Sequence, residues 1–438
     1  MKTPIFDFVS RYSKSGNARM HMPGHKGVPL LGCEPFDITE ISGADSLYEA
    51  NGIIKESEKN ASSLFGCDTY FSTEGSSQCI RAMLYLAIKK RRDKTKRPKI
   101  LAPRNVHKAF LYAAAMLDFD IEWLYGGSYL SADLPKADVE RAIALHSPDA
   151  LYVTSPDYLG KVCDIAALAE VCHENGVMLL SDNAHGAYLK FLSPSLHPCD
   201  CGADICCDSA HKTLPSLTGG AYLHVSNRIS HTDKEVKDAL ALFGSTSPSY
   251  LTLASLDLVN KYISDGYEKK LSAFCKRIDS LKDELTAHGY TLFGNEKLKI
   301  TILAKEYGYL GHDLAKLLFD KGIVCEFCDR DFLTLMLTPE CDRDIKHLGD
   351  TLLGIEKREK IAEAAPVPSA CEKVLDVRKA TFADSELVNT EDSIGRVLAS
   401  PSVGCPPAVP IVMCGERIDE NAAKSFRYYG IEKVSVVK

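Results

Sequence analysis

Short apolar runs alternate with amphipathic segments along residues 60–260 of the chain. Runs rich in β-branched and aromatic residues predict six strands, at 69–73, 99–103, 120–125, 150–155, 177–182 and 204–209. Apolar residues at helical spacing predict four helices between them, at 77–91, 107–117, 137–146 and 164–175. This alternation predicts an α/β fold, in which helices cover both faces of a mostly parallel sheet.

The pattern changes beyond this region, which indicates more than one domain. Helical periodicity resumes near residues 250–290, and a shorter α/β pattern follows to about residue 357. The segment AAPVPS at 364–369 is typical of a linker. A chain of 438 residues also exceeds what one hydrophobic core usually covers. We expect an N-terminal segment (1–60), a large domain (61–260), a small α/β domain (261–363) and a compact C-terminal domain (370–438).

Polar residues follow the predicted strands, and in such sheets ligands bind beyond the carboxyl ends of the strands. The segments are Glu74-Gly75-Ser76-Ser77, Arg104-Asn105-Val106-His107-Lys108, Asp182-Asn183-Ala184-His185-Gly186 and Ser209-Ala210-His211-Lys212-Thr213. The strand ends therefore offer hydroxyls at a helix start, a carboxylate, histidines and a lysine.

These side chains match what pyridoxal 5′-phosphate (PLP) requires. Its phosphate needs a helix N-terminus with hydroxyls, its pyridine nitrogen a carboxylate, its aldehyde a lysine and its ring a flat partner. Three lysines follow a histidine, but only Lys212 comes directly after a buried-looking strand, whereas Lys26 lies in a Pro-Gly loop and Lys108 begins a helix. We predict that Lys212 carries the cofactor as a Schiff base and that Asp182 pairs with the pyridine nitrogen.

Each residue also has a plainer interpretation when it is taken alone. An isolated lysine is most often a solvated surface charge, and Asp182 alone is a helix cap or turn former. His107 and His185 alone are hydrogen-bonded structural histidines. The order in which these residues follow the strands favours the cofactor interpretation.

Composition excludes several classes of protein. The formal net charge of −7 argues against a nucleic-acid binder, which needs a basic footprint. The N-terminal residues have scattered charges and no apolar core, unlike a signal peptide. Prolines 401, 406, 407 and 410 interrupt the uncharged stretch 397–415, so it does not predict a membrane-spanning helix. We expect a soluble cytoplasmic protein with neither membrane nor nucleic acid as a partner.

Sixteen cysteines without a secretion signal predict reduced thiols rather than a disulfide framework. One cluster, Cys199, Cys201, Cys206 and Cys207, raises the question of a metal site. It has no CxxC pair, and Cys206 and Cys207 are adjacent in a strand-like run. The spacing favours buried small apolar side chains, so the sequence predicts no metal site.

Four motifs, in this order, resemble the Orn/Lys/Arg decarboxylase family of the major-domain type. They are HMPGHKG (21–27), PRNVHK (103–108), DNAHG (182–186) and SAHK (209–212). The segments IGR (394–396), PPAVP (406–410) and GE (415–416) are similar to the C-terminal domain of that family. The resemblance spans nearly the whole chain. It implies PLP fold type I, which is aspartate-aminotransferase-like, with a mostly parallel large-domain sheet of the seven-stranded type.

The resemblance also implies roles for residues at these positions. Lys212 would carry the cofactor, Asp182 would pair with its pyridine nitrogen, His107 would stack on its ring, and His185 would lie near the ring phenolate and the substrate. The residues implied to surround the phosphate are Gly75, Ser76, Ser77, Ser209 and His211. A hydroxyl of Ser245-Thr246-Ser247, which we assign to Thr246, would reach the phosphate of a neighbouring subunit. This implies a homodimer or a dimer of dimers with shared active sites.

The implied reaction is the decarboxylation of a basic amino acid (arginine, lysine or ornithine) to the corresponding amine and CO2. A cationic substrate tail needs a carboxylate, and the candidates are Asp45 and Glu49, whose alternative role is that of solvated loop acids. Two departures from the family pattern, Asn183 in place of glutamate and Thr218-Gly219-Gly220 in place of a glutamine-bearing version, suggest altered substrate choice. The first motif begins within thirty residues of the start, so we expect neither an N-terminal wing domain nor high-order rings.

Two other functions remain open. Another fold-type I PLP enzyme, an aminotransferase or a lyase acting on a different amino acid, would share every cofactor residue. A non-catalytic descendant that binds PLP is the second alternative, and intact Lys212 and Asp182 argue against it. Fold resemblance alone does not choose the reaction.

Overall fold

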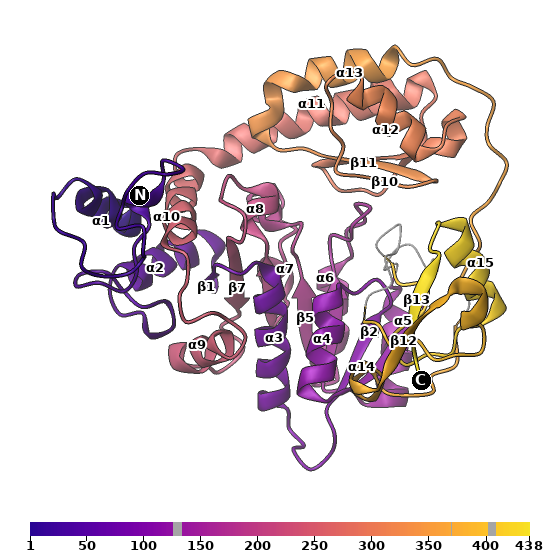
Figure 1. Cartoon of the computed structure of the whole chain (residues 1–438), viewed down its shortest axis with the longest axis horizontal. Coiled ribbons are helices and arrows are strands. Elements are labelled where there is room, and N and C mark those ends of the chain that lie inside the picture. Colours follow the sequence, from indigo (N-terminus) through magenta and orange to yellow (C-terminus); the bar gives the residue numbers. More distant parts are fainter. Residues whose placement is uncertain (126–133, 369, 402–408) are drawn as a thin grey trace. The chain divides into compact units, whose positions relative to one another are not determined.

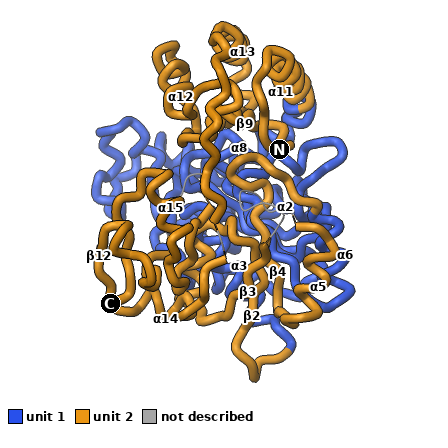
Figure 2. Tube along the Cα trace, turned by 90° about the vertical axis from the view of Figure 1, so that its right-hand side faces the viewer, with its two compact units in different colours: residues 1–92, 165–271 blue, residues 93–164, 272–438 orange. Residues whose placement is uncertain are grey.

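The computed structural model describes residues 1–125, 134–368, 370–401 and 409–438 (Figure 1). Ser369 of the expected linker and residues 406–408 of the C-terminal motif lie outside the described residues. The chain forms two compact units that interleave in sequence. Residues 1–92 and 165–271 form the first unit, and residues 93–164 and 272–438 form the second (Figure 2). The domain boundaries expected from the sequence stay a prediction.

A seven-stranded sheet contains all the strands that the sequence predicts, in the order β1-β7-β6-β5-β4-β2-β3. The strands are β1 (Asp68–Ser72), β2 (Lys99–Pro103), β3 (Asp120–Leu124), β4 (Ala150–Thr154), β5 (Met178–Asp182), β6 (Ile205–Asp208) and β7 (Ala221–Val225). The six predicted strands agree with β1 to β6 to within one residue at each end. The predicted α/β fold with a mostly parallel sheet is confirmed.

The seventh strand, β7, was not among the predicted ones, and it determines the direction of β1. It pairs antiparallel with both β1 and β6, so the two reversals leave β1 running in the same direction as β6. Strand β5 pairs parallel with β6. The carboxyl ends of β1, β5 and β6 therefore lie at one edge of the sheet, where the segments 73–77, 183–186 and 209–213 continue the chain.

The strands of the first unit are covered by helices. Strand β7 is buried along its whole length, as are all four residues of β6, which is the expected pattern for strands covered on both faces. Helix α3 (Ser76–Lys90) packs on β5, β6 and β7 and buries Cys79 and Met83. The other helices that begin in this unit are α1 (Pro4–Ser13), α2 (Ile53–Phe65), α6 (Ile165–Glu174), α7 (Pro198–Cys201), α8 (Ala210–Thr213), α9 (Asp233–Ala241), α10 (Tyr250–Ser264) and α11 (Tyr267–His288).

The second unit contains β2, β3 and β4 with helices α4 (Lys108–Leu117) and α5 (Lys136–His146). A second, antiparallel sheet has the order β10-β11-β9-β8. Its elements and accompanying helices are β8 (Leu292–Phe293), β9 (Lys299–Leu303), α12 (Gly311–Phe319), β10 (Phe327–Cys328), β11 (Phe332–Met336) and α13 (Ile345–Leu353).

The four helices predicted between the first strands, α3 to α6, are confirmed to within one residue. Among the residues with assigned structure, no helix is both long and apolar enough to cross a membrane.

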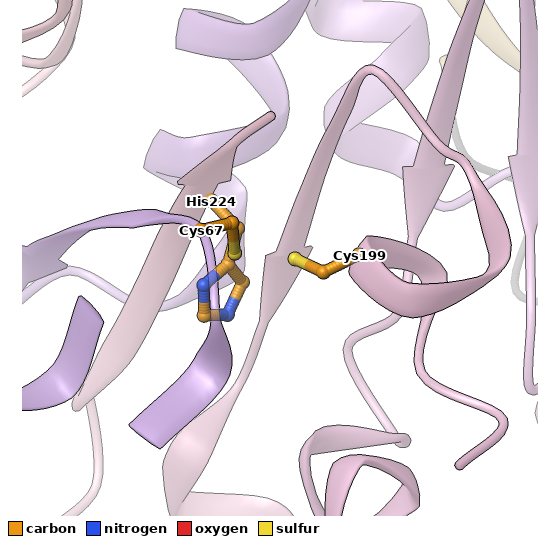
Figure 3. A group of neighbouring side chains, drawn as sticks. All are labelled: Cys67, Cys199 and His224. Atoms are coloured by element: carbon orange, nitrogen blue, oxygen red, sulfur yellow. The ribbon is translucent and has the colours of Figure 1, made fainter. Parts of the chain in front are cut away.

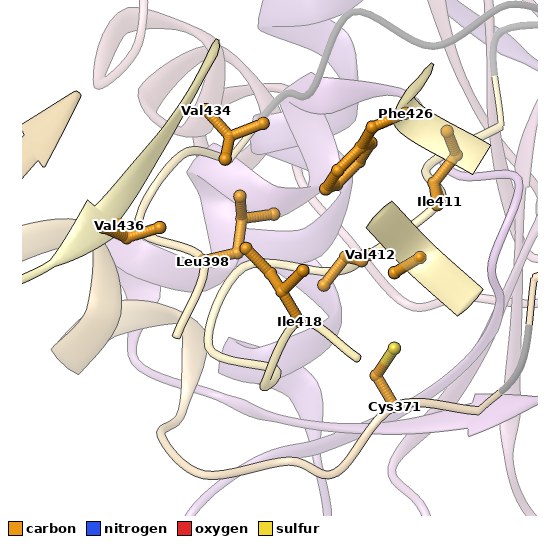
Figure 4. Packing of buried hydrophobic residues seen from close by; sticks show 9 residues of the cluster. Cys371, Leu398, Ile411, Val412, Ile418, Phe426, Val434 and Val436 are labelled. Atoms are coloured by element: carbon orange, nitrogen blue, oxygen red, sulfur yellow. The ribbon is translucent and has the colours of Figure 1, made fainter. Parts of the chain in front are cut away.

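The C-terminal part of the second unit has a hydrophobic core of its own (Figure 4). Its elements are α14 (Val377–Phe382), β12 (Ser385–Asn389), α15 (Glu420–Tyr428) and β13 (Lys433–Val437), and β12 pairs antiparallel with β13. Phe426 of α15 packs with Val434 and Val436 of β13 and with Leu398. Arg378 of α14 donates to the backbone oxygen of Ala115 at 2.6 Å, which ties this part to the end of α4.

Candidate active site

Lys212 lies in α8, the short helix that follows β6, and its side chain is half-buried. Its Nζ atom lies 3.0 Å from Nε2 of His185, which follows β5. When Nζ is an ammonium group it can only donate, and Nε2 of His185 is then the acceptor of this hydrogen bond. The structure thus brings two of the four predicted catalytic side chains into direct contact.

Asp182 is the last residue of β5 and is 1% exposed. Its Oδ1 atom accepts the backbone N–H of Ala184 at 3.2 Å, and the Cys207 thiol of the neighbouring strand lies 3.9 Å from the same oxygen. These contacts hold the carboxylate at the edge where β5 and β6 end. A buried carboxylate is stabilised by a cation or by several donors, so this position suits a partner with a positively charged N–H group.

The N-terminus of α3 lies at the same edge and has no side-chain cap. Gly75 precedes it with φ +71°, and the Gly75 N–H donates to the Gly219 carbonyl at 2.8 Å. The Ser209 hydroxyl donates to the Ser76 hydroxyl at 2.9 Å, and both residues are buried. Uncapped N–H groups beside hydroxyls form a site suited to a phosphate group. Ser77, one residue on, is half-buried.

The glycine pair after the lysine has a structural reason. Gly219 has φ +93°, and a Cβ atom there would lie 2.6 Å from the backbone oxygen of Thr73, so only glycine fits this close approach. The carbonyl of Gly220 accepts a hydrogen bond from the His211 ring at 2.9 Å when Nδ1 is protonated. The departure at 218–220 therefore supports the turn that leads into α3 and orients His211.

Asn183, the other departure from the family pattern, faces Asp208 rather than open space. Its Nδ2 atom donates to Asp208 Oδ1 at 2.7 Å, and both residues are fully buried. A glutamate at 183 would bring a second carboxylate into this buried position, where two like charges repel each other. This pairing gives asparagine a structural reason at position 183, and altered substrate choice stays a prediction.

Thr246 and His107 are both exposed in this chain. The Ser245 N–H donates to the Glu74 carboxylate, which holds the segment 245–247 beside the turn before α3. His107 is the N-cap of α4, and its Nδ1 accepts the N–H of Ala109 at 3.2 Å. His107 belongs to the second unit and Lys212 to the first. Ring stacking by His107 and phosphate binding by Thr246 stay predictions.

The two substrate-binding candidates differ in their surroundings. Asp45 is 6% exposed, and its carboxylate accepts backbone N–H groups around the start of α2, from Ser46 at 3.0 Å, Asn51 at 3.1 Å, Gly52 at 2.8 Å and Ile54 at 3.1 Å. Both of its oxygens are therefore engaged in shaping the chain before α2. These contacts favour a structural role for Asp45, and substrate binding by Asp45 stays a prediction. Glu49 is exposed and remains the other candidate.

Sequence reasoning missed a buried ion pair that involves the PRNVHK motif. Arg104 makes a bidentate contact with Glu416 of the C-terminal part, at 2.6 Å from Nη1 to Oε1 and 3.0 Å from Nη2 to Oε2. Glu416 is 2% exposed. The pair holds the first residue of the loop that ends at His107. The residues are 312 positions apart, so no local pattern connects them.

The chain matches known proteins over nearly its whole length. A family model described as Orn/Lys/Arg decarboxylase, major domain, matches residues 3–303, and one described as Orn/Lys/Arg decarboxylase, C-terminal domain, matches residues 365–434. The chain is 30% identical to the arginine decarboxylase of Halalkalibacterium halodurans over 463 residues, which cover 96% of this chain and 92% of that protein. It is 28% identical to the arginine decarboxylase of Bacillus subtilis over 467 residues, which cover 97% and 93%.

A solved structure also shares the fold. The crystal structure of the lysine decarboxylase from Francisella novicida superposes with a TM-score of 0.78 at 17% sequence identity, covering all of this chain and 81% of that one. At this identity the likeness concerns the fold.

Proposed function

The chain belongs to the Orn/Lys/Arg decarboxylase family, and on this premise we propose that it decarboxylates a basic amino acid, arginine first, with PLP held at Lys212. The observation that carries the proposal is the contact between Lys212 and His185 at the sheet edge where Asp182 ends β5. The two relatives described above are arginine decarboxylases, which favours arginine over lysine and ornithine.

The donor set at this edge fits PLP. Lys212 would hold the aldehyde carbon, Asp182 the pyridine nitrogen, and the uncapped N-terminus of α3 the phosphate. The phosphate would also meet Ser76, Ser77, Ser209 and His211. When bound, PLP supplies a protonated ring that accepts the electron pair left by the departing carboxyl group.

The residues of the chain have three tasks in this reaction. The buried Asp182 carboxylate would favour the protonated form of a ring nitrogen opposite it, because a buried negative charge is stabilised by a counter-charge. Lys212 Nζ and His185 Nε2, 3.0 Å apart, form a pair that can deliver a proton to the carbon that has lost CO2. The site must also avoid stabilising the substrate's α-carboxylate, since binding the ground state tightly would raise the barrier.

The direct test is CO2 release from arginine, lysine and ornithine labelled at the carboxyl carbon. We expect arginine to release labelled CO2 and to yield the corresponding amine. Keto-acid formation without CO2 release would identify an aminotransferase instead. A purified protein that retains PLP but turns over none of the three amino acids would favour the non-catalytic alternative.

Replacing Asp182 with asparagine is expected to leave cofactor binding in place while lowering kcat by about 10²–10³-fold, the scale for removing one preorganised electrostatic group. An amide cannot hold a proton on the pyridine nitrogen, whereas the phosphate contacts at α3 are unchanged. The measurements are the visible absorption spectrum for cofactor content and CO2 release for turnover. Near wild-type turnover in the variant would show that Asp182 is only structural.

Replacing Glu49 with glutamine is expected to lower kcat/KM for arginine by about 2–4 kcal/mol, the scale for removing one partner of a charge pair that binding buries. Glu40→Gln is the matched control, because Glu40 is an exposed acid in the same segment. Asp45→Asn should lower the free energy of unfolding without changing the order of preference among the three amino acids. Equal kcat/KM in the Glu49 variant and wild type would remove Glu49 from the substrate site.

We expect assembly into a homodimer or a dimer of dimers, in which exposed Thr246 reaches the phosphate site of a neighbouring subunit. Size exclusion with light scattering should therefore give a mass of two or four chains of 48.0 kDa each. Thr246→Val should weaken PLP binding while leaving this mass unchanged. A fully active monomer would contradict both expectations.

A further inference from the structure

A group of thiol and imidazole side chains lies inside the first unit (Figure 3). Cys67 precedes β1, His224 lies in β7, and Cys199 lies in α7. One ligand atom from each, two Sγ atoms and a ring nitrogen, all lie within 4.8 Å of one another. Cys67 is 6% exposed and His224 is fully buried. Three donors from separate parts of the chain therefore converge in the interior.

The strand geometry separates this group from the cofactor residues. Cys206 and Cys207 are successive residues of β6, so their side chains point to opposite faces of the sheet. Cys207 contacts Asp182, whereas Cys206 Sγ lies 3.5 Å from Cys199 Sγ. The cysteines that the sequence groups together thus divide between the two faces. Cys206 stands next to the converging donors as a further thiol.

The buried carboxylate of Asp208 contacts the imidazole ring of His224. His224 Nε2 lies 3.1 Å from Asp208 Oδ2, and Asp208 is fully buried. In metal sites, a ligating histidine commonly donates its second ring N–H to a carboxylate, which orients the ring and makes the other nitrogen more basic. The nitrogen left to bind is Nδ1, which contacts the Thr69 hydroxyl at 2.9 Å. Thr69 keeps a partner without it, because its hydroxyl also donates to the Cys67 carbonyl at 3.1 Å.

Cysteine binds a metal ion as the thiolate. A thiophilic cation bound by Cys67 and Cys199 would therefore displace the two thiol protons.

We propose that Cys67, Cys199 and His224 bind one thiophilic divalent metal ion, with zinc as the expected ion, and that Asp208 orients His224. Thiolate sulfur and imidazole nitrogen are the ligands that zinc prefers. Cys206 lies 3.5 Å from Cys199 but groups with Cys199 and His197 rather than with Cys67 and His224, so the proposed ligand set has three members. The ion would be structural, because it would tie together the start of β1, the middle of β7 and α7 in the buried interior.

The test uses the full chain, purified under reducing conditions, stripped with a chelator and titrated with Zn²⁺ and then with Co²⁺. We expect about one zinc ion per chain, release of about two protons per ion, and near-ultraviolet absorption from thiolate–cobalt charge transfer. Cys67→Ser and Cys199→Ser should each weaken zinc binding by more than about 100-fold, and Asp208→Asn by about 10–100-fold, the scale for an outer-shell partner. Cys172→Ser, a buried cysteine of α6 outside the cluster, is the matched control and should bind zinc as wild type does.

Three results would overturn the proposal. The first is a folded wild-type chain that binds no zinc and shows no cobalt charge-transfer band, a measurement that does not depend on any variant folding. The second is a disulfide between Cys199 and either Cys67 or Cys206, found by peptide mapping of protein prepared without oxidant. Wild-type affinity in a folded Cys67→Ser or Cys199→Ser variant, checked by circular dichroism, would equally remove that residue from the site and with it the proposed ligand set.

Discussion

Lys212→Ala is expected to abolish covalent retention of PLP after borohydride reduction and to lower kcat by at least about 10²–10⁴-fold, the contribution of a positioned proton-transfer group alone. Two effects combine in this variant. It removes the amine that would hold the cofactor, and it removes the donor that contacts His185 at 3.0 Å. Tryptic mapping of the reduced wild-type protein should place the adduct on the peptide that contains Lys212.

Lys26 and Lys108 provide matched controls, because each also follows a histidine and both are exposed. Lys26→Ala and Lys108→Ala should keep the adduct on Lys212. An adduct on either of these lysines in the wild-type protein would show that the residue after β6 is not the cofactor lysine. The family assignment would survive that result, because it rests on matches over the whole chain.

Glu416→Gln is expected to lower the free energy of unfolding of the second unit by about 3–5 kcal/mol, the cost of leaving one partner of a buried ion pair without its counter-charge. Arg104 would then keep a buried guanidinium whose bidentate acceptor has become a neutral amide. The single tryptophan, Trp123, lies in β3 of the same unit, so urea unfolding followed by its fluorescence reports on this region.

The pair between Arg417 and Glu372 is the control for this experiment. It also joins an arginine to a glutamate at 2.8 Å, but both side chains are exposed, at 44% and 68%. Glu372→Gln should therefore change the free energy of unfolding by no more than about 1 kcal/mol, as is usual for surface ion pairs. Equal effects of the two substitutions would mean that the buried pair does not hold the C-terminal part to the PRNVHK loop.

Local patterns were sufficient to predict β1 to β6 and α3 to α6. A strand covered on both faces has a short continuous apolar run, as in ALYVT of β4, and an amphipathic helix places its apolar residues at helical spacing. The position of Lys212 directly after such a run is the reason why the sequence predicts it as the cofactor lysine. These features depend on neighbours within a few residues, which is why one sequence reveals them.

The tertiary structure alone decided the direction of β1. The carboxyl end of β1 meets those of β5 and β6 because β7 pairs antiparallel with both β1 and β6. The sequence of a strand does not reveal the direction in which the strand runs in the sheet. The direction of β1 therefore places the uncapped start of α3 at the same edge of the sheet as Asp182 and Lys212. Asp45 also shows what only the tertiary structure reveals. The sequence places this acid in a loop, where acids are usually solvated, but backbone N–H groups of residues 46–54 donate to its carboxylate.

Motifs and local periodicity were sufficient to identify the family and the α/β class, and they predict Lys212 as the cofactor lysine. The tertiary structure decided which distant side chains meet. Arg104 and Glu416 pair across 312 positions, and Cys67, Cys199 and His224 converge from three separate parts of the chain. Ion pairs and ligand clusters form between side chains that are close in space, and strand order and pairing, rather than spacing along the chain, bring those side chains together.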